Sequence, residues 1–357
     1  MKILTVIGAR PQFVKAAVVS RAMLKSAFIK EIVVHTGQHF DENMSKIFFD
    51  ELGMSLPKYN LGIGGGSHGE NIGRMIEAIE KVLIKEKPDY ILVYGDTDST
   101  LAASISASKL NIPIAHIEAG LRSYNRKMPE EINRVLTDHA STILFTPTTK
   151  AFETLINEGI KPEMIINVGD VMFDAALYFG KLSEDSTSIL DRLNLKSKDY
   201  VLATVHRQEN VDDADTLANI IKGLGLGNKN IILPLHPRTK KKLQELGIRL
   251  PEKIRIIDPV GYLDMVQLEK NAEIIVTDSG GVQKEAFFHQ VPCITLRNET
   301  EWVELVEFGF NKLTGSDANK ISLALNCPNE SILNWDIPIY GNGNAADKIV
   351  SYFMGLN

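Results

Sequence analysis

The chain has 357 residues, of which 44% are hydrophobic and 24% are charged, and its formal net charge is −6 at pH 7. These are ordinary values for a globular protein, and division of the length by roughly 150 residues per domain predicts two domains. Because the net charge is negative and the sequence has no dense run of basic residues, we do not expect nucleic acid as a partner. No apolar run reaches the roughly 18 residues that a membrane span needs, so we expect no membrane partner either.

The N-terminus and the cysteines indicate a compartment. The first apolar run, which ends before Gly8, is too short for the core of a signal sequence and is better interpreted as a buried strand. Cys293 and Cys327 cannot form a disulfide framework and do not have metal-ligand spacing. We therefore expect a cytoplasmic protein that binds no metal and needs no cofactor.

Short β-rich runs alternate with amphipathic helical patterns, which is typical of parallel sheets with helices on both faces. The first series predicts strands near 3–7, 31–35, 90–94, 113–117, 142–145 and 165–168, with helices that begin near Pro11, Asn43, His68, Thr97, Pro129 and Thr148. The second series predicts strands near 200–205, 230–234, 253–257, 273–277 and 292–296, with helices that begin near Asp213, Arg238, Tyr262, Gly280 and Thr300. The pattern predicts an α/β protein with two doubly wound domains.

The boundary between the two series falls within 168–190, near the polar, serine-rich stretch Lys181–Ser188. We divide the chain into an N-terminal Rossmann-like domain of residues 1–170 and a C-terminal Rossmann-like domain of residues 171–344. The last segment, 345–357, contains a short helix, and we expect it to join the first domain.

Carboxylates gather in the stretch Val93–Arg134. Asp96 and Glu118 follow strands that should be neighbours, and Glu130 lies in the first turn after Pro129. Strand carboxyl ends and helix N-termini are where open α/β sheets bind ligands. Several carboxylates in such a place suit removal of a proton from carbon and its return to a product. The alternative is a solvent-exposed helix with ion pairs, because Glu130 and Arg134 are four residues apart.

Two turns suit an anion. In the first, Arg10 and Lys15 flank a helix N-terminus at the end of the first strand, an arrangement that suits a diphosphate. A solvated pair of charges beside an ordinary turn explains it equally well.

A glycine-rich run, Gly62–Gly69, could cradle phosphate, act as a lid or form a plain surface loop, and the plain loop is the simplest interpretation.

The second turn, Thr277–Glu285, follows a strand of the second domain. Ser279, Gly280 and Gly281 can hold phosphate oxygens with free N–H groups, and Glu285 can accept the two hydroxyls of a ribose. The alternative is a helix that is merely capped by its own aspartate or serine. Together the two turns predict a ligand with a nucleoside diphosphate.

Two histidines of the second domain follow strands. His206 could act as a general acid or donate to a phosphate, and Arg207 beside it could contact the same anion. His236 follows the next strand and is closer to an ordinary structural histidine, although it remains a candidate for substrate binding.

The order of ten motifs resembles the non-hydrolysing UDP-N-acetylglucosamine 2-epimerase family from Lys2 to about Gly315: GARPQFVKAA, HTGQHFDENM, GDTDSTLAA, HIEAGLRS, MPEEINR, GDVMFDAAL, HRQENVDD, HPRT, TDSGGVQKEA and TLRNETEW. The resemblance implies two Rossmann-like domains facing across a cleft, in the arrangement called GT-B, and a homodimer. It also implies inversion of C2 of a UDP-sugar through elimination of UDP to a 2-acetamidoglycal and its re-addition, a reaction that serves surface polysaccharide synthesis.

By the same resemblance, the acids and bases are Asp96, Glu118, Glu130 and His206. The contacts to uridine diphosphate are Arg10, Lys15, Ser279, Gly280, Gly281 and Glu285, with Arg134 near the sugar. Gln12 and Trp302 replace a glutamate and an arginine of many bacterial members, as in the branch that acts on UDP-2,3-diacetamido-2,3-dideoxy-glucuronate. A hydrolysing epimerase, a GT-B glycosyltransferase and a non-catalytic nucleotide-sugar-binding protein are the alternatives.

Overall fold

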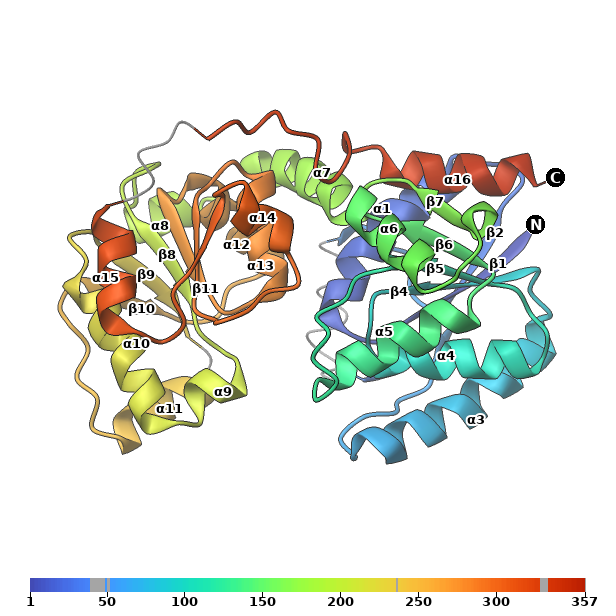
Figure 1. The fold of residues 1–357 in the computed structure, drawn as a ribbon, viewed down its shortest axis with the longest axis horizontal. Helices are drawn as coiled ribbons and strands as arrows, with labels where there is room; N and C mark the ends of the chain where they lie inside the picture. The colour runs from blue at the N-terminus through green and yellow to red at the C-terminus, as the bar shows by residue number, and fades with distance from the viewer. Residues whose placement is uncertain (39–48, 50–51, 236, 328–332, 357) are drawn as a thin grey trace. The chain divides into compact units, whose positions relative to one another are not determined.

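The computed structural model describes the chain apart from residues 39–48, 50–51, 236, 328–332 and 357 (Figure 1). It contains two compact units. Unit 1 comprises Met1–Ala175 and Pro338–Asn357, and unit 2 comprises Ala176–Ile337. The helix predicted near Asn43 falls on residues that the structure does not describe.

Unit 1 is built on a parallel seven-stranded sheet in the order β3-β2-β1-β4-β5-β6-β7. Its strands are β1 (Lys2–Ile7), β2 (Lys30–His35), β3 (Tyr59–Asn60), β4 (Tyr90–Tyr94), β5 (Ile114–Ile117), β6 (Ile143–Thr146) and β7 (Ile165–Asn167). Its helices are α1 (Arg10–Leu24), α3 (His68–Glu86), α4 (Asp98–Lys109), α5 (Pro129–Ala140), α6 (Thr149–Asn157), the start of α7 (Val171–Ser186) and α16 (Ala345–Gly355). The strand order reverses between β1 and β4, and such a switch point is where doubly wound sheets bind ligands.

Unit 2 repeats this plan with a parallel six-stranded sheet in the order β10-β9-β8-β11-β12-β13. The strands are β8 (Val201–Thr204), β9 (Ile231–Pro234), β10 (Ile254–Ile257), β11 (Ile274–Thr277), β12 (Cys293–Thr295) and β13 (Asn311–Leu313). The helices are α8 (Ile189–Leu193), α9 (Gln208–Val211), α10 (Ala214–Leu226), α11 (Pro237–Glu245), α12 (Tyr262–Asn271), α13 (Gly280–Phe288), α14 (Val303–Glu307) and α15 (Ala318–Asn326). Here the order reverses between β8 and β11.

The two parallel sheets confirm the predicted fold class, and every predicted strand is present with its ends shifted by at most two residues. The sequence did not predict β3 and β13, because strands of two and three residues that contain polar side chains carry no apolar run. The helix expected to begin near Thr300 begins at Val303 as α14.

The last helix completes unit 1. Figure 1 shows α16 beside α1, and the two helices are in contact. The Asp174 carboxylate accepts hydrogen bonds from the N–H groups of Ala345 and Ala346, which are the first residues of α16. Phe353 is fully buried and packs edge-on against the rings of Tyr90 and Phe145. In the described part of the chain, no helix combines the length and apolar character that crossing a membrane requires.

Candidate active site

Gln12 joins the two loops at the switch point of unit 1. Its side chain is buried, and its Oε1 accepts hydrogen bonds from the N–H groups of Gly8, at 2.7 Å, and Ala9, at 3.0 Å. Its Nε2 donates to the Tyr94 carbonyl oxygen at 2.9 Å and to Thr100 Oγ1 at 3.0 Å. Gln12 therefore ties the turn after β1 to the turn after β4. The sequence marked Gln12 only as a departure from related chains, because a partner 82 residues away leaves no local pattern.

The basic residues of the first turn lie at different depths. Arg10 is the first residue of α1 and is exposed. Lys15 lies more than one turn further and is buried, and its Nζ forms a hydrogen-bonded ion pair with Glu118 Oε2. This pair joins the predicted diphosphate turn directly to the predicted carboxylates.

Glu118 comes directly after β5, which pairs with β4 as predicted. The backbone of Glu118 has φ 71°, a conformation that a glutamate rarely adopts, and its side chain is buried. Gly95 lies opposite with φ 60°, and a Cβ at that position would meet Glu118 Oε2 at 3.1 Å and Lys15 Nζ at 3.5 Å. Only a glycine combines this backbone conformation with room for the ion pair.

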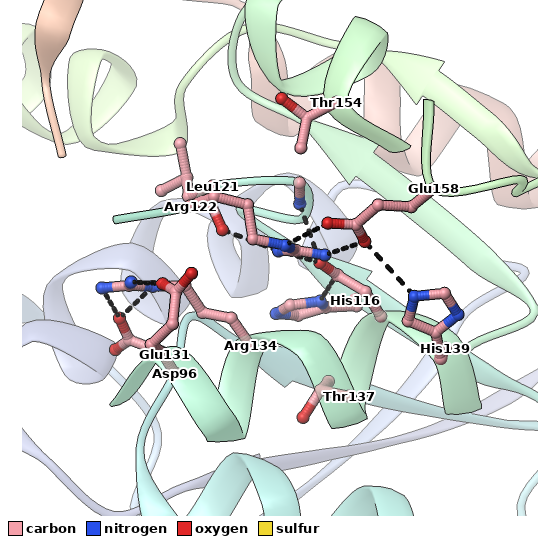
Figure 2. Close-up of polar contacts among 12 residues, drawn as sticks. Asp96, His116, Leu121, Arg122, Glu131, Arg134, Thr137, His139, Thr154 and Glu158 are labelled. Atoms are coloured by element: carbon pink, nitrogen blue, oxygen red, sulfur yellow. Dashed lines mark hydrogen bonds and ion pairs between the residues drawn. The ribbon is translucent and has the colours of Figure 1, made fainter. Parts of the chain in front are cut away.

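Asp96 is held by Arg134 (Figure 2), whose Nε and Nη2 lie 2.9 Å and 2.8 Å from Asp96 Oδ2. The Asp96 carbonyl oxygen accepts a hydrogen bond from Asn133 Nδ2 at 2.9 Å. Arg134 also donates to Glu131 at 2.6 Å. Arg134 therefore holds Asp96, a catalytic candidate, in place. The sequence did not predict this contact, because the four-residue spacing between Glu130 and Arg134 suggests Glu130 as the partner.

Glu130 is exposed in the first turn of α5. It lines a pocket of about 240 Å³ together with Lys15, Asp96, His68 and other residues of the switch point. A larger pocket of about 380 Å³ lies along the C-terminal half of α1 and contains none of the predicted site residues. We take the smaller pocket as the candidate site because the charged groups converge there.

The sequence missed one pair in this pocket. His68, the first residue of α3, lies with Nδ1 2.7 Å from Asp98 Oδ2, and Asn133 Nδ2 lies 3.2 Å from Asp98 Oδ1. The glycine-rich run before His68 was interpreted as a plain loop, but its last residues bring a histidine to the site. The signal was present in the sequence as a histidine that directly follows a helix-capping serine, Ser67.

In unit 2, one buried carboxylate organises the loop after β8. Asp278 is fully buried, and its oxygens accept hydrogen bonds from the N–H groups of His206 and Arg207 at 3.0 Å. The exposed His206 ring lies with Nδ1 3.3 Å from Asp278 Oδ1, and Arg207 forms an ion pair with Glu209 at 3.6 Å. Asp278 therefore brings His206 and Arg207 to the switch point of unit 2. His236 lies outside the described residues, so its role stays a prediction.

The glycine-rich turn of unit 2 begins α13. Ser279 is the N-cap and accepts a hydrogen bond from the Val282 N–H, as the capping alternative predicts. Gly280 and Gly281 are the first two helical residues, and the Gly280 carbonyl oxygen accepts a hydrogen bond from Trp302 Nε1 at 2.8 Å. The Trp302 ring also covers Lys284, whose Nζ lies 4.1 Å from the ring centroid.

Glu285 is buried one turn into α13, near a second acid. Burial first, and then the negative charge of Glu285, raise the pKa of Glu269 well above its usual range. The same causes raise the pKa of the Tyr262 hydroxyl. The protonated form of Glu269 is therefore favoured beside the Glu285 carboxylate.

The structure brings the predicted residues together within each unit. In unit 1, two ion pairs join Lys15 to Glu118 and Arg134 to Asp96, and Glu130 lines the same pocket as Lys15 and Asp96. In unit 2, β8 and β11 are paired, so the loops that carry His206 and Ser279 leave adjacent strands.

Comparisons with known proteins agree with this picture. The family model for UDP-N-acetylglucosamine 2-epimerase matches residues 21–354. A Methanococcus maripaludis protein named as a homolog of UDP-N-acetylglucosamine 2-epimerase is 54% identical over 363 residues and covers 100% of both chains. The UDP-2,3-diacetamido-2,3-dideoxy-D-glucuronate 2-epimerase of Pseudomonas aeruginosa is 51% identical over 362 residues, again with 100% of both chains covered.

Among solved structures, the chain is similar to the Methanocaldococcus jannaschii UDP-GlcNAc 2-epimerase in complex with UDP-GlcNAc and UDP. The TM-score is 0.91 at 47% identity, and the alignment covers 99% of this chain and 100% of the other. Sequence and fold agree over almost the whole chain, and the protein belongs to the UDP-N-acetylglucosamine 2-epimerase family.

Proposed function

We propose that the protein inverts C2 of a UDP-linked 2-acetamido sugar without net hydrolysis. The observation that carries the proposal is the Lys15–Glu118 ion pair next to Asp96 at the switch point of unit 1. Lys15 suits a diphosphate, Asp96 and Glu130 suit proton transfer, and all three line one pocket, which supports the proposal. The family membership supports the same conclusion.

The reaction has two balanced halves. In the first, a carboxylate takes the C2 proton, the C2–H electrons form the C1–C2 double bond, and the C1–O bond breaks so that UDP leaves with its electron pair. In the second, UDP adds back to C1 while another acid protonates C2 from the opposite face. The C2 proton is weakly acidic, so its removal must be coupled to stabilisation of charge on the departing UDP.

Lys15 provides this coupling. In the structure its ammonium group neutralises Glu118. When Lys15 instead binds the diphosphate, Glu118 loses its cationic partner and becomes the stronger base, since an adjacent positive charge favours a carboxylate's ionised form. We therefore assign proton removal to Glu118 and proton return to Asp96 or Glu130, with Arg10 as a further contact to the diphosphate.

Unit 2 supplies the groups that suit the nucleotide. Ser279, Gly280 and Gly281 offer the N-terminus of α13 to phosphate oxygens, and Glu285 is the acceptor for ribose hydroxyls. His206 and Arg207 are a further acid and a further anion contact. His236 keeps its proposed place in substrate binding.

UDP-N-acetylglucosamine is the first candidate substrate, with UDP-N-acetylmannosamine as the product. The 2,3-diacetamido-glucuronate derivative is the second, favoured by Gln12 and Trp302 and by the 51% identity to an enzyme of that name. The protein should be incubated with each sugar in heavy water and the products followed by NMR. An epimerase produces the C2 epimer with deuterium at C2. Free UDP with N-acetylmannosamine indicates a hydrolase. If neither sugar gives a product or takes up deuterium, the proposal is contradicted.

We also propose that the protein works in the cytoplasm as a homodimer. Light scattering should then give a solution mass of twice 39.6 kDa. A mass of a single chain, independent of concentration, argues against the dimer.

A glycosyltransferase would need an added acceptor for turnover, and a sensor would bind UDP-sugars without turnover, so the NMR assay also separates these alternatives.

A further inference from the structure

The imidazole of His116 on β5 is completely buried, and Figure 2 shows it among its polar partners. Its Nε2 lies 2.8 Å from the Gly95 carbonyl oxygen, and its Nδ1 lies 2.7 Å from Asp138 Oδ1. A carbonyl oxygen can only accept a hydrogen bond, so Nε2 carries a proton. Whether Nδ1 carries one too depends on Asp138.

Asp138 is ionised in this setting. Its Oδ2 accepts hydrogen bonds from Arg122 Nη1 at 2.7 Å and from the Gly120 N–H at 3.1 Å. Burial raises the pKa of Asp138, whereas the hydrogen bonds and charges of its partners lower it, and the net shift is downward. Without any contribution from His116, the Arg122 guanidinium and the Gly120 N–H on Oδ2 both favour the ionised carboxylate. An ionised carboxylate has no proton to donate, so the hydrogen bond must come from His116 Nδ1.

The ion pairs beside His116 extend from Asp138 to the surface. Arg122 forms two hydrogen bonds with Glu158, Nε to Oε1 at 2.8 Å and Nη2 to Oε2 at 2.7 Å. Two cations, His116 and Arg122, then match two carboxylates, Asp138 and Glu158. His139 Nε2 lies 3.2 Å from Glu158 Oε2 at the exposed end of this chain of contacts. Because Glu158 is partly exposed, solvent can compensate its charge, and the argument for the imidazolium rests on the hydrogen bonds that the two ring nitrogens donate.

The hydrogen bond to Gly95 reaches the reacting groups. Gly95 also donates its N–H to the Ile117 carbonyl oxygen at 3.0 Å, so both polar backbone groups of Gly95 are fixed by β5. The next residue is Asp96, and its carboxylate and carbonyl oxygen are fixed by α5 through Arg134 and Asn133. His116 fixes the Gly95 carbonyl group and therefore helps to set the orientation of the Asp96 side chain at the end of β4.

We propose that His116 is a positioning residue, held as an imidazolium by Asp138, which fixes the Gly95–Asp96 turn for proton transfer. The proposal rests on the proposed function because it assumes that Asp96 takes part in the reaction. His116 does not touch the pocket itself, so its effect is on turnover and not on binding of UDP.

NMR tests the charge without any assay of activity. The protein is labelled with ¹⁵N-histidine, and the ring signals of His116 are assigned by their loss in His116→Gln. Both ring nitrogens of His116 should show the shift of a protonated nitrogen at pH 7 to 8. One unprotonated ring nitrogen in that range overturns the imidazolium.

A matched pair of variants tests the positioning. Glutamine places an amide where Nε2 lies and can keep the donor to Gly95, whereas asparagine reaches only the position of Nδ1. We expect His116→Asn to lower kcat about 100-fold, the effect of a displacement near 1 Å, with KM and UDP affinity little changed. His116→Gln should retain much more of the kcat, and His139→Gln, at the exposed end of the same contacts, should match the wild type.

Equal loss of kcat in His116→Asn and His116→Gln, or a loss that follows their melting temperatures, overturns the positioning role. The wild-type enzyme provides the last distinction. If it turns over neither sugar, the proposed function fails, while the NMR result still decides the charge of His116.

Discussion

At the scale of single residues, the most unusual feature is the backbone of Glu118. A non-glycine residue in the left-handed region stores strain, and such residues cluster at functional sites. Here the left-handed backbone conformation directs the Glu118 carboxylate toward Lys15. The sequence showed that Glu118 follows a strand but could not show this turn, because the conformation is imposed by the surrounding loops. Sequence reasoning therefore reached the correct loop ends but not the ion pairs that join them.

Exchange of Glu130 for glutamine tests its part in proton transfer. Glu130→Gln removes the acid but keeps the size of the side chain, so UDP binding should be almost unchanged while kcat falls by roughly two to four orders of magnitude. Calorimetric titration with UDP and the NMR assay measure the two quantities. Glu153→Gln, an exposed glutamate on α6, serves as the control. Full activity in Glu130→Gln removes this residue from the mechanism.

Gly95 offers a second test with a closely matched control. Gly95→Ala places a methyl group 3.1 Å from Glu118 Oε2 at a position with φ 60°, whereas Gly159→Ala has φ 85° with no atom within 4 Å. Both variants should lose about 1 kcal/mol of stability, since alanine is strained at positive φ. Only Gly95→Ala should lose turnover, because only it displaces the Lys15–Glu118 pair. Equal activity of the two variants would show that the close approach does not matter.

At the scale of elements, α5 holds most of the site together. Glu131, Asn133, Arg134 and Asp138 project from one helix and fix loops that follow β4 and β5. The sequence predicted this helix and its acidic first turn. It named Glu130 and did not predict the role of Glu131, because adjacent residues on a helix face directions about 100° apart and only packing shows which one is buried. The structure buries Glu131 and exposes Glu130.

The buried Glu131 carboxylate makes unit 1 sensitive to acid. Burial raises its pKa, but hydrogen bonds from Ser123 and Tyr124 and the charge of Arg134 outweigh this and lower it below 4.5. The unfolded chain therefore binds the proton more readily, so the stabilisation is present above pH 4.5 and is lost as the pH falls through the lower folded value. Melting temperatures between about pH 6 and pH 3 should fall more steeply for the wild type than for Glu131→Gln. Parallel curves would contradict this role.

At the scale of the whole molecule, the sequence predicted two doubly wound α/β units because strand and helix patterns alternate over the entire chain. The same pattern placed the predicted ligand residues at strand ends, after the first, third and fourth strands of the first series and the first, second and fourth strands of the second. It did not predict the strand order that defines the switch points, nor the links across them, because Gln12 with Tyr94 and Asp278 with His206 join residues more than 70 positions apart. Long-range hydrogen bonds leave no periodic trace in the sequence.

The return of α16 to unit 1 predicts that a change near the C-terminus destabilises the N-terminal sheet. Phe353→Ala removes a fully buried ring that packs on Tyr90 and Phe145, and such a change typically lowers stability by about 3–5 kcal/mol. Met354→Ala, at the exposed neighbouring position, is the control. Hydrogen exchange should accelerate in β4 and β6 of the Phe353→Ala protein. Unchanged exchange there would mean that α16 contributes little to the sheet.

The position of α16 also has a consequence for how the protein is made. A ribosome completes residues 1–175 early but makes α16 only after unit 2, which is encoded between them. At ~5–20 residues per second, the first sheet waits roughly 10 to 40 seconds with the surface around Tyr90 and Phe145 uncovered. The nascent chain thus exposes aromatic side chains while unit 2 is synthesised. The half of the protein that is translated first is the half that finishes folding last.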